Sequence, residues 1–490
     1  SSFGPSRAAP GVRAPAGMSS HVPPELRARL EAAGQAHVLR FLDEGKLPAG
    51  EEAGLLKQLG ELDLDHIAKI HQNAMADISG DPSQHDLAPP DDFTCLSDTK
   101  AKDIEAWEGA GLDAVARGEV AACVLAGGQG TRLGFDGPKG CYDIGLPSGK
   151  PLFQLIAEKI RRLATLAGKD GVARIPFLVM TSPINDAATR VFFEEHKFFG
   201  LPEGDVWIFS QGTLPCLTAE GRLMLESAGA LAAAPDGNAG IYPALQKSGC
   251  ITRLQENGVK YLHVFSIDNV LCRPADPRFM GYCISRDADC GNKCVWKVSP
   301  DEKVGVVAKL DGRPGVVEYS ELSELHKNQR NDAGRLVFGA GNICNHFFTI
   351  AFLAEEVIPN MSSIFHAAHK KIPFADDAGN TKKPEKNNGI KLEGFIFDVF
   401  SMSKRMAILE TTREEEFSPV KNEPGAATDS PDTARSMVSA LARSWVKAAG
   451  GQVEGSADAI LEISPLLSYA GEGLKERVDG KTLAAPAHLE

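Results

Sequence analysis

Short apolar runs alternate with amphipathic segments between residues 119 and 269. The apolar runs cover 119–128, 174–182, 205–212 and 260–269, and helical patterns such as 151–168 and 185–200 separate them. Strands that alternate with helices predict right-handed βαβ units and a parallel or mixed sheet with both faces covered. Each run ends in a polar, glycine-rich or acidic turn: GGQGTR, TSPIND, SQGTLP and SIDN. Because ligands bind outside the carboxyl ends of the strands in such sheets, the four turns predict one binding crevice.

The segments on either side predict a fold in several parts. Helical patterns recur at 25–42, 51–77 and 101–117, the segment 304–349 is rich in strand patterns, and both patterns mix after residue 401. We therefore expect an α/β protein with a disordered leader at 1–24, a helical N-terminal domain at 25–118, a central domain at 119–400 and a small C-terminal domain at 401–490. The leader lacks acidic residues, which fits either a targeting segment or a remnant of cloning.

Composition excludes two classes of partner. The net charge of -13 argues against a nucleic-acid binder, and no run of eighteen apolar residues is present to span a membrane. The ten cysteines are scattered and form no CxxC pair, so we expect buried thiols in a reducing compartment, the cytoplasm. Cys290 and Cys294 are four residues apart, but without a second pair nearby they make a weak zinc motif.

The strongest motif is the glycine loop LAGGQGTRLG (125–134), which follows a predicted strand and precedes Pro138-Lys139-Gly140. Its glycines let the backbone approach a ligand and present N–H groups to anionic oxygens. Arg132 and Lys139 add positive charge that suits a triphosphate. A dehydrogenase loop is the alternative, but it needs an acidic residue after the second strand, where only Asp186 is available.

The glycine loop resembles the signature of the eukaryotic UDP-N-acetylhexosamine pyrophosphorylases. Further motifs in the same order carry the resemblance: SQGTLPC (210–216), APDGNAG (234–240), SIDN (266–269), VEYSE (317–321), AGNICNHFF (340–348), GFIFDVF (394–400), EFSPVKN (416–422) and ISPLLSYAGEGL (463–474). The related UDP-glucose and UDP-sugar pyrophosphorylases share the glycine loop, but EFSPVKN together with SYAGEGL is not expected of them. The resemblance implies a Rossmann-like nucleotidyltransferase sheet with an N-terminal helical cap and a small C-terminal domain.

The resemblance also implies a role for individual residues. For the nucleotide, Gly127 and Gly128 would meet the uracil and Gln211 would read its edge, and Gly237 and Asn238 would contact nucleotide and sugar. For the N-acetylhexosamine, the contacts would be Gly305, Glu318 and Asn342, with Phe395 and Phe397 as pocket walls. At the phosphates, Arg132, Lys139 and Lys421 would act as catalytic cations, and Asp268 would hold a Mg²⁺ or Mn²⁺ ion.

The activity implied is the joining of UTP to N-acetylglucosamine-1-phosphate, which yields UDP-N-acetylglucosamine and pyrophosphate. A sugar phosphate is an anionic nucleophile near neutral pH, because the second pKa of a phosphate monoester is about 6, so no general base is required. A preference for UDP-N-acetylgalactosamine or a broader range of UDP-sugars is the main rival. A catalytically dead nucleotide-sugar sensor is another, which the intact Arg132, Lys139, Asp268 and Lys421 argue against.

Purely structural interpretations stay open for single residues. Taken alone, Lys139 and Lys421 fit surface lysines, Asp268 fits a helix cap, and the alternation of Phe395 and Phe397 fits a core strand. Asn185 likewise fits the cap of the helix at 185–200. Two residues depart from the family pattern, namely Ala239 after PDGN and Gly339 before AGN, where related chains carry glycine and asparagine. If Lys139 and Lys421 reach the same phosphates, the C-terminal segment must close over the central one.

Overall fold

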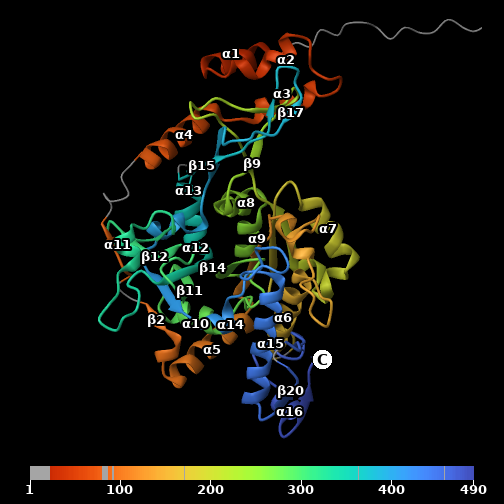
Figure 1. Ribbon diagram of the computed structural model, residues 1–490, viewed down its shortest axis with the longest axis vertical. Coiled ribbons are helices and arrows are strands. Elements are labelled where there is room, and N and C mark those ends of the chain that lie inside the picture. The colour runs from red at the N-terminus through yellow and green to blue at the C-terminus, as the bar shows by residue number, and fades with distance from the viewer. Residues whose placement is uncertain (1–21, 80–85, 91–92, 170, 362–363, 457) are drawn as a thin grey trace, which may run out of the picture. The chain divides into compact units, whose positions relative to one another are not determined.

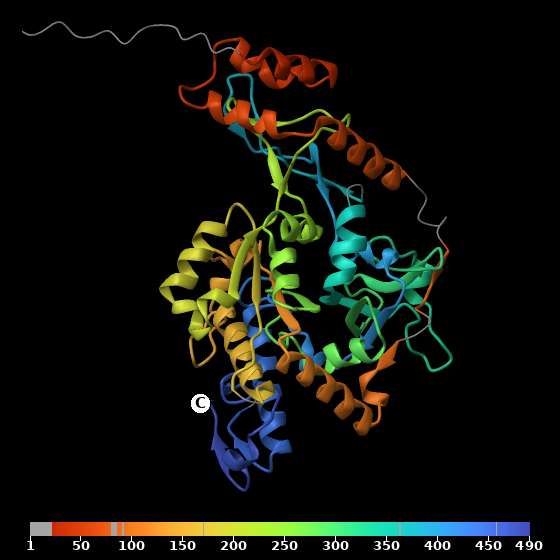
Figure 2. The ribbon, with the colours of Figure 1, turned by 180° about the vertical axis from the view of Figure 1, so that it is seen from behind.

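The computed structural model describes residues 22–79, 86–90, 93–169, 171–361, 364–456 and 458–490 (Figures 1 and 2). The chain forms two compact units. Unit 1 comprises the described residues up to 72, with 214–234 and 367–391, and unit 2 comprises 73–213, 235–366 and 392–490. The expected leader lies almost wholly outside the described residues. Both expected boundaries, 118/119 and 400/401, fall within unit 2.

Unit 1 combines short helices with small two-stranded ladders. Its elements are α1 (Pro24–Ala32), the 3₁₀ helix η1 (Ala36–Leu39), α2 (Arg40–Asp43), α3 (Glu52–Glu61), the first part of α4 (Leu64–Ser79), β7 (Leu225–Ser227), β8 (Ala230–Leu231), β16 (Phe374–Ala375) and β17 (Thr381–Lys382). The prediction of one helix over 25–42 is wrong. Gly34 has φ +68°, a left-handed conformation that ends α1.

The chain passes between the units within α4 and along two strand pairs. These are β6 (Thr213–Pro215) with β9 (Ala233–Pro235), and β15 (His366–Lys370) with β18 (Gly389–Glu393).

Unit 2 is built on a mixed sheet, which has eleven strands in the described part of the chain. Its main path runs β2-β19-β11-β14-β10-β3-β4-β5, with β1, β12 and β13 added beside β14. The strands are β1 (Leu87–Ala88), β2 (Thr94–Cys95), β3 (Val120–Leu125), β4 (Phe177–Thr181), β5 (Val206–Ser210), β10 (Tyr261–Ser266), β11 (Cys290–Trp296), β12 (Val306–Leu310), β13 (Arg313–Val317), β14 (Ala340–Thr349) and β19 (Met406–Glu410). On the main path only β14 runs against its neighbours. The four strands predicted between 119 and 269 are confirmed as β3, β4, β5 and β10.

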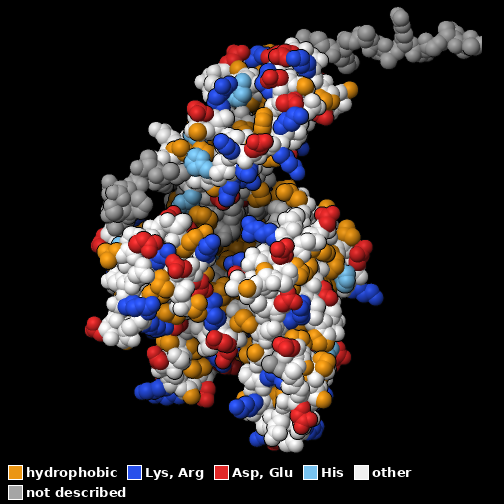
Figure 3. All heavy atoms as spheres, in the orientation of Figure 1, with side chains coloured by type: hydrophobic (Ala, Val, Ile, Leu, Met, Phe, Trp, Pro, Cys, Tyr) orange, Lys and Arg blue, Asp and Glu red, His pale blue; other side chains and the backbone are white. Residues whose placement is uncertain are grey.

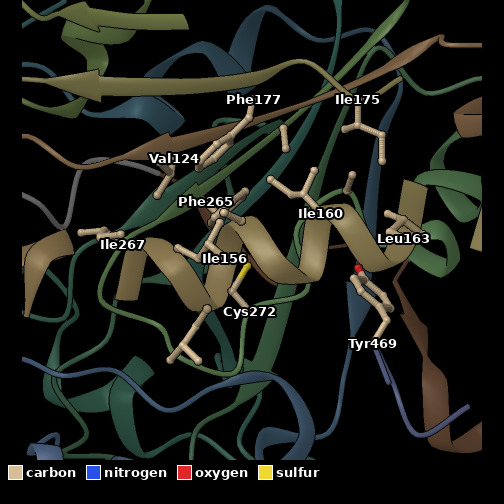
Figure 4. Packing of buried hydrophobic residues seen from close by; sticks show 14 of the residues in the cluster. Val124, Ile156, Ile160, Leu163, Ile175, Phe177, Phe265, Ile267, Cys272 and Tyr469 are labelled. Atoms are coloured by element: carbon tan, nitrogen blue, oxygen red, sulfur yellow. The ribbon is translucent and has the colours of Figure 1, made fainter. Parts of the chain in front are cut away.

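Both faces of the sheet are buried, as the continuous apolar runs predicted. Alternate residues of β3 enter two separate cores: Ala122 and Val124 pack in one, and Ala121 and Cys123 in the other. The first core includes side chains of α5 (Ala101–Ala116), α6 (Leu152–Ala167), α10 (Pro277–Ser285) and α15 (Pro431–Ala448). Figure 4 shows α6 laid along this core, with Ile156 and Ile160 facing Phe265 and Phe177. The second core includes α8 (Ile241–Lys247), α9 (Cys250–Glu256) and α12 (Ile350–Phe352).

Unit 2 has further helices and strands outside the main sheet and the helices named above. They are α7 (Asp186–Glu195), α11 (Glu324–Asn328), α13 (Ile358–Asn360), α14 (Arg413–Glu416), α16 (Lys475–Val478), β20 (Gln452–Glu454), β21 (Leu461–Ile463), β22 (Thr482–Ala484) and β23 (Ala487–Leu489). The segment after residue 401 therefore supplies one strand, β19, to the central sheet, together with a small packed group of its own. Across the described residues, none of the helices combines the length and apolar character that crossing a membrane requires.

The order of the parallel strands positions the site. The chain runs outward from β3 to β4 and β5, and later returns to place β10 on the other side of β3. The loops that follow β3 and β10 therefore diverge, which makes this edge a topological switch point where α/β sheets bind ligands. The predicted glycine loop follows β3, Gln211 follows β5, and Asp268 follows β10, so all three lie at one edge of the sheet.

Candidate active site

The glycine loop is closed on itself by backbone hydrogen bonds. Gly130 N–H donates to Gly137 O (2.9 Å), and Lys139 N–H donates to Gly128 O (3.1 Å). These bonds place the backbone of Lys139 beside Gly128, near the start of the loop. A Cβ built on Gly128 would meet no atom within 4 Å, so this glycine borders open space. The loop thus has room for a ligand directly beside its bare backbone.

Asn185 holds the loop in place. The residue directly precedes α7, but its side chain makes no capping hydrogen bond there. Instead its Nδ2 donates to Ala126 O (2.9 Å) and Gly128 O (3.2 Å), and its Oδ1 accepts from Ser182 N–H (2.8 Å). Asn185 therefore stands at the predicted N-cap position of α7, but its fully buried amide cross-links the turns after β3 and β4 instead of capping the helix. Asp186, the residue a dehydrogenase would need, is bonded to Thr181 and Arg190.

Gln211 lies against Gly127. The resemblance implies that both residues contact the uracil, and their proximity is consistent with that. A Cβ on Gly127 would stand 3.3 Å from Gln211 Oε1 and 3.5 Å from Ser182 Cβ. Gln211 is buried, with 8% of its surface exposed, and its N–H donates to Thr181 O (2.9 Å). The small residue at 127 leaves the Gln211 amide next to the loop backbone, where a planar base edge can meet both.

Three cations and one carboxylate gather beside the loop. Burial lowers the pKa of Lys139, Lys421 and Arg132 lower it further, and Asp268 opposes them. Lys139 Nζ also donates to Val420 O (3.2 Å), one residue before Lys421. Two further cations that together lower the pKa of a buried lysine indicate a site built to receive an anion. The structure therefore brings together all four residues assigned to the phosphates, with Lys421 already beside Lys139.

The segments that carry Asp268 and Lys421 pair with each other. Val420 N–H donates to Asp268 O (2.9 Å), and Val270 N–H donates to Ser418 O (3.2 Å). The Asn269 side chain completes the pairing: its Nδ2 donates to Glu416 O (2.7 Å) and its Oδ1 accepts from Ser418 N–H (2.9 Å). The paired segments fix the backbone of Lys421 relative to that of Asp268.

A buried ion cluster anchors this pairing. Lys293 Nζ contacts Asp276 Oδ2 (2.5 Å) and Glu416 Oε2 (3.0 Å), and Arg273 contacts the other oxygen of Glu416 (3.6 Å). Although burial alone would lower it, Asp276 and Glu416 raise the pKa of Lys293. Removing one partner from such a cluster leaves an uncompensated buried charge, which costs about 3–5 kcal/mol.

Gly305, Glu318 and Asn342 form a second group. A Cβ on Gly305 would stand 3.1 Å from Glu318 Oε1, and Asn342 N–H donates to Gly305 O (2.8 Å). Burial raises the pKa of Glu318, and Glu321 and Asp398 add to this, whereas His366 and Lys421 oppose it. Because Lys421 acts on both Lys139 and Glu318, this group adjoins the cation cluster.

The PDGN turn and the GFIFDVF segment close this second group. Gly237 has φ +87°, and a Cβ there would stand 2.3 Å from Gly394 O, so only glycine fits. Asn238 Oδ1 accepts from Ile396 N–H (2.8 Å). Phe395 and Phe397 do not alternate along a strand as their spacing suggested. They lie at the start of a 3₁₀ helix, η10 (Ile396–Met402), with their rings stacked 5.0 Å apart.

Comparison with known proteins agrees with this arrangement. Residues 85–427 match a protein family described as UTP–glucose-1-phosphate uridylyltransferase. The chain belongs to this family. It is 42% identical to human UDP-N-acetylhexosamine pyrophosphorylase-like protein 1, over 95% of this chain and 97% of the human protein. It is 40% identical to UDP-N-acetylglucosamine diphosphorylase 1 of Arabidopsis thaliana, over 94% of this chain and 92% of that protein.

A solved structure extends the likeness to three dimensions. The uridine diphosphate N-acetylglucosamine pyrophosphorylase of Trypanosoma brucei, crystallised with an inhibitor, superimposes with a TM-score of 0.82 at 32% identity. The match covers 96% of this chain and 99% of the trypanosomal one. The predicted membership of the UDP-N-acetylhexosamine pyrophosphorylases and the predicted α/β fold are confirmed.

One departure of this uridylyltransferase from the family pattern has a visible reason. A Cβ on Gly339 would stand 2.0 Å from Trp296 Nε1, so the indole fills the space where related chains carry asparagine. Ala239 packs in the second core, and a Cβ on Gly394 would come within 2.8 Å of its methyl group. Neither residue belongs to the group of Gly305, Glu318 and Asn342.

Prediction for the base end: Gln211→Ala should weaken the preference for UTP over CTP by about tenfold or more, because the base edge loses its partner in a water-poor site. Gly127→Val should weaken UTP binding itself, since its side chain would collide with Gln211 Oε1. Affinities from calorimetry with both nucleotides check this. The matched control is Gln58→Ala in unit 1, which should leave both affinities unchanged. An unaltered UTP-to-CTP ratio in Gln211→Ala would show that Gln211 does not read the base.

Proposed function

We propose that this protein is a cytoplasmic UDP-N-acetylglucosamine diphosphorylase, which joins UTP to N-acetylglucosamine-1-phosphate. The observation that carries the proposal is the row of three groups at one sheet edge. Gln211 with the glycine loop suits uracil, Arg132, Lys139 and Lys421 suit phosphates, and Gly305, Glu318 and Asn342 suit a sugar. The printed names of the human, plant and trypanosomal relatives support the N-acetylhexosamine.

The reaction asks for alignment and charge neutralisation. A phosphate oxygen of the sugar phosphate attacks the α-phosphorus of UTP in line, a new P–O bond forms, and the bond to the β-phosphate oxygen breaks to release pyrophosphate. The nucleophile is already ionised near neutral pH, because its second pKa is about 6. Lys139 and Lys421 are far apart in the sequence but lie near each other in the fold. Their fixed charges would stabilise the oxygens that gain charge.

A magnesium or manganese ion is part of the proposal. Asp268 is the carboxylate that would hold it, and Asp429 is nearby: burial raises the pKa of Asp429, with Asp268 adding to the rise and Lys421 opposing it. Within the described ranges, no three His, Cys, Asp or Glu side chains form a metal cage. Mg²⁺ commonly takes one or two carboxylates and completes its shell with phosphates and water, so these residues fit it. The ion would supply further neutralisation at the α-phosphate.

Prediction for the substrate: with Mg²⁺, the purified protein should release pyrophosphate from UTP and N-acetylglucosamine-1-phosphate with a kcat/KM about a hundredfold above that with glucose-1-phosphate. The reason is that Glu318 and Asn342 would be left without partners beside a sugar that lacks the acetamido group. A coupled pyrophosphate assay with a panel of sugar-1-phosphates measures this, and chelation by EDTA should abolish turnover. Equal turnover of the two sugars would refute the selectivity, and preferred use of N-acetylgalactosamine-1-phosphate would favour the rival product.

Prediction for the cation cluster: Lys421→Ala should lower kcat about a hundredfold or more, since loss of a group that stabilises transferring oxygens costs about 3 kcal/mol. Lys421→Arg should restore activity only in part, because a planar fork replaces a point charge. The control is Lys447→Ala, an exposed lysine on α15. Steady-state kinetics decide the matter: a Lys421→Ala enzyme within about threefold of wild type would contradict the catalytic role.

A further inference from the structure

We propose that His366 is a further specificity-determining residue, which acts on the sugar and not on the nucleotide. This inference rests on the proposed function. His366 is the first residue of β15, outside every motif that carried the resemblance, and it lies in unit 2 with Glu318 and Phe395. Its imidazole contacts an aromatic stack and a buried carboxylate, and it lies within electrostatic range of the carboxylate of Glu318.

The imidazole extends the aromatic pair into a row of three rings. His366 and Phe395 have ring centroids 4.8 Å apart at an interplanar angle of 34°. Phe395 and Phe397 follow at 5.0 Å and 17°. The first pair is tilted and the second is stacked. Rings at these distances attract each other, and each orders its neighbour. The orientation of Phe395 therefore depends on rings on both of its sides.

Asp398 contacts both His366 and Phe395, the first two residues of this row. Its Oδ1 lies 3.1 Å from His366 Nε2, and its Oδ2 accepts the backbone N–H of Phe395 (2.7 Å). The Asp398 side chain is 7% exposed, whereas that of His366 is 37% exposed. One buried carboxylate thus holds a partly open imidazole and the backbone of its stacking partner in a fixed relation.

The same imidazole is close enough to Glu318 to lower its pKa, against the effect of burial. Glu318 in turn lies beside Gly305, where an added Cβ would stand 3.1 Å from Glu318 Oε1, and Lys421 acts on Glu318 from the phosphate side. A sugar held by Glu318 would thus have the aromatic row as its neighbour. Aromatic faces pack on the C–H face of a pyranose and on an acetamido methyl, which a hydroxyl cannot replace. His366 would therefore favour N-acetylated sugars by fixing the ring row.

Binding of the product tests this without turnover. Calorimetry should compare UDP-N-acetylglucosamine with UDP on wild type, His366→Ala and Asp398→Asn. In Asp398→Asn the amide can accept only one of the two hydrogen bonds. We expect both variants to bind UDP-N-acetylglucosamine about tenfold more weakly than wild type, with UDP affinity within about twofold. His369→Ala, an exposed histidine on the same strand, should match wild type.

The outcomes separate the two proposals. Wild type that binds UDP-N-acetylglucosamine no tighter than UDP refutes the proposed sugar, and the role of His366 falls with it. Wild type that prefers the sugar nucleotide while both variants keep that preference refutes only the role of His366. An equal loss of affinity for UDP in both variants also refutes it, because general disorder of the site would then explain the change. Melting temperatures establish which variants are folded, and Asp398→Asn keeps the test valid if His366→Ala does not fold.

Discussion

The buried contact between Lys293 and Glu416 is the interaction on which the rest of the site depends. It places a charged pair with side chains 1–2% exposed behind the turn after β10, where Asp276 and Arg273 complete the set of charges. Such a cluster is weak evidence of stability, because desolvation offsets most of the attraction. Its effect here is geometric. Glu416 begins the segment that ends in Lys421, so fixing Glu416 fixes the register of the pairing between Asn269 and Ser418.

The turn after β10 is held from other sides as well. Lys159 of α6 donates to Val270 O and Cys272 O (2.8 Å each), and Tyr469 donates to Pro274 O (3.0 Å). Tyr469 belongs to the last of the family motifs, which thus stabilises the turn after β10 without lying among the candidate site residues. Three regions far apart in the sequence converge on one turn, and the half-buried Asp268 stands near its start. Preorganisation of this kind lets fixed charges act on phosphates without reorganisation during the reaction.

Much of this could be predicted from the sequence, for identifiable reasons. Strands β3, β4, β5 and β10 are buried on both faces, so their composition is continuous and apolar, and their polar ends mark the site edge. Residues in contiguous motifs, such as Gly127 and Lys421, could be named as candidate site residues through the family resemblance. The contacts of Asn185, Asn269 and His366 could not be predicted, because each depends on a partner distant in the sequence: Ala126, Glu416 and Asp398. The ring positions of Phe395 and Phe397 were misjudged since spacing of two suits a strand and a 3₁₀ turn alike.

The central claim is that the pairing of the two segments holds Lys421 at the phosphates, and a double-mutant cycle of kcat tests it most directly. Asn269→Ala removes both side-chain hydrogen bonds of the pairing and leaves Glu416 O and Ser418 N–H unpaired, at a cost of about 1–3 kcal/mol for each buried group. Pyrophosphate release should be measured for Asn269→Ala, Lys421→Ala and the double variant. If Asn269 acts through Lys421, the double variant should be no more than about threefold slower than Lys421→Ala alone. Effects that multiply, with Asn269→Ala slowing the Lys421→Ala enzyme as much as it slows wild type, would contradict the claim.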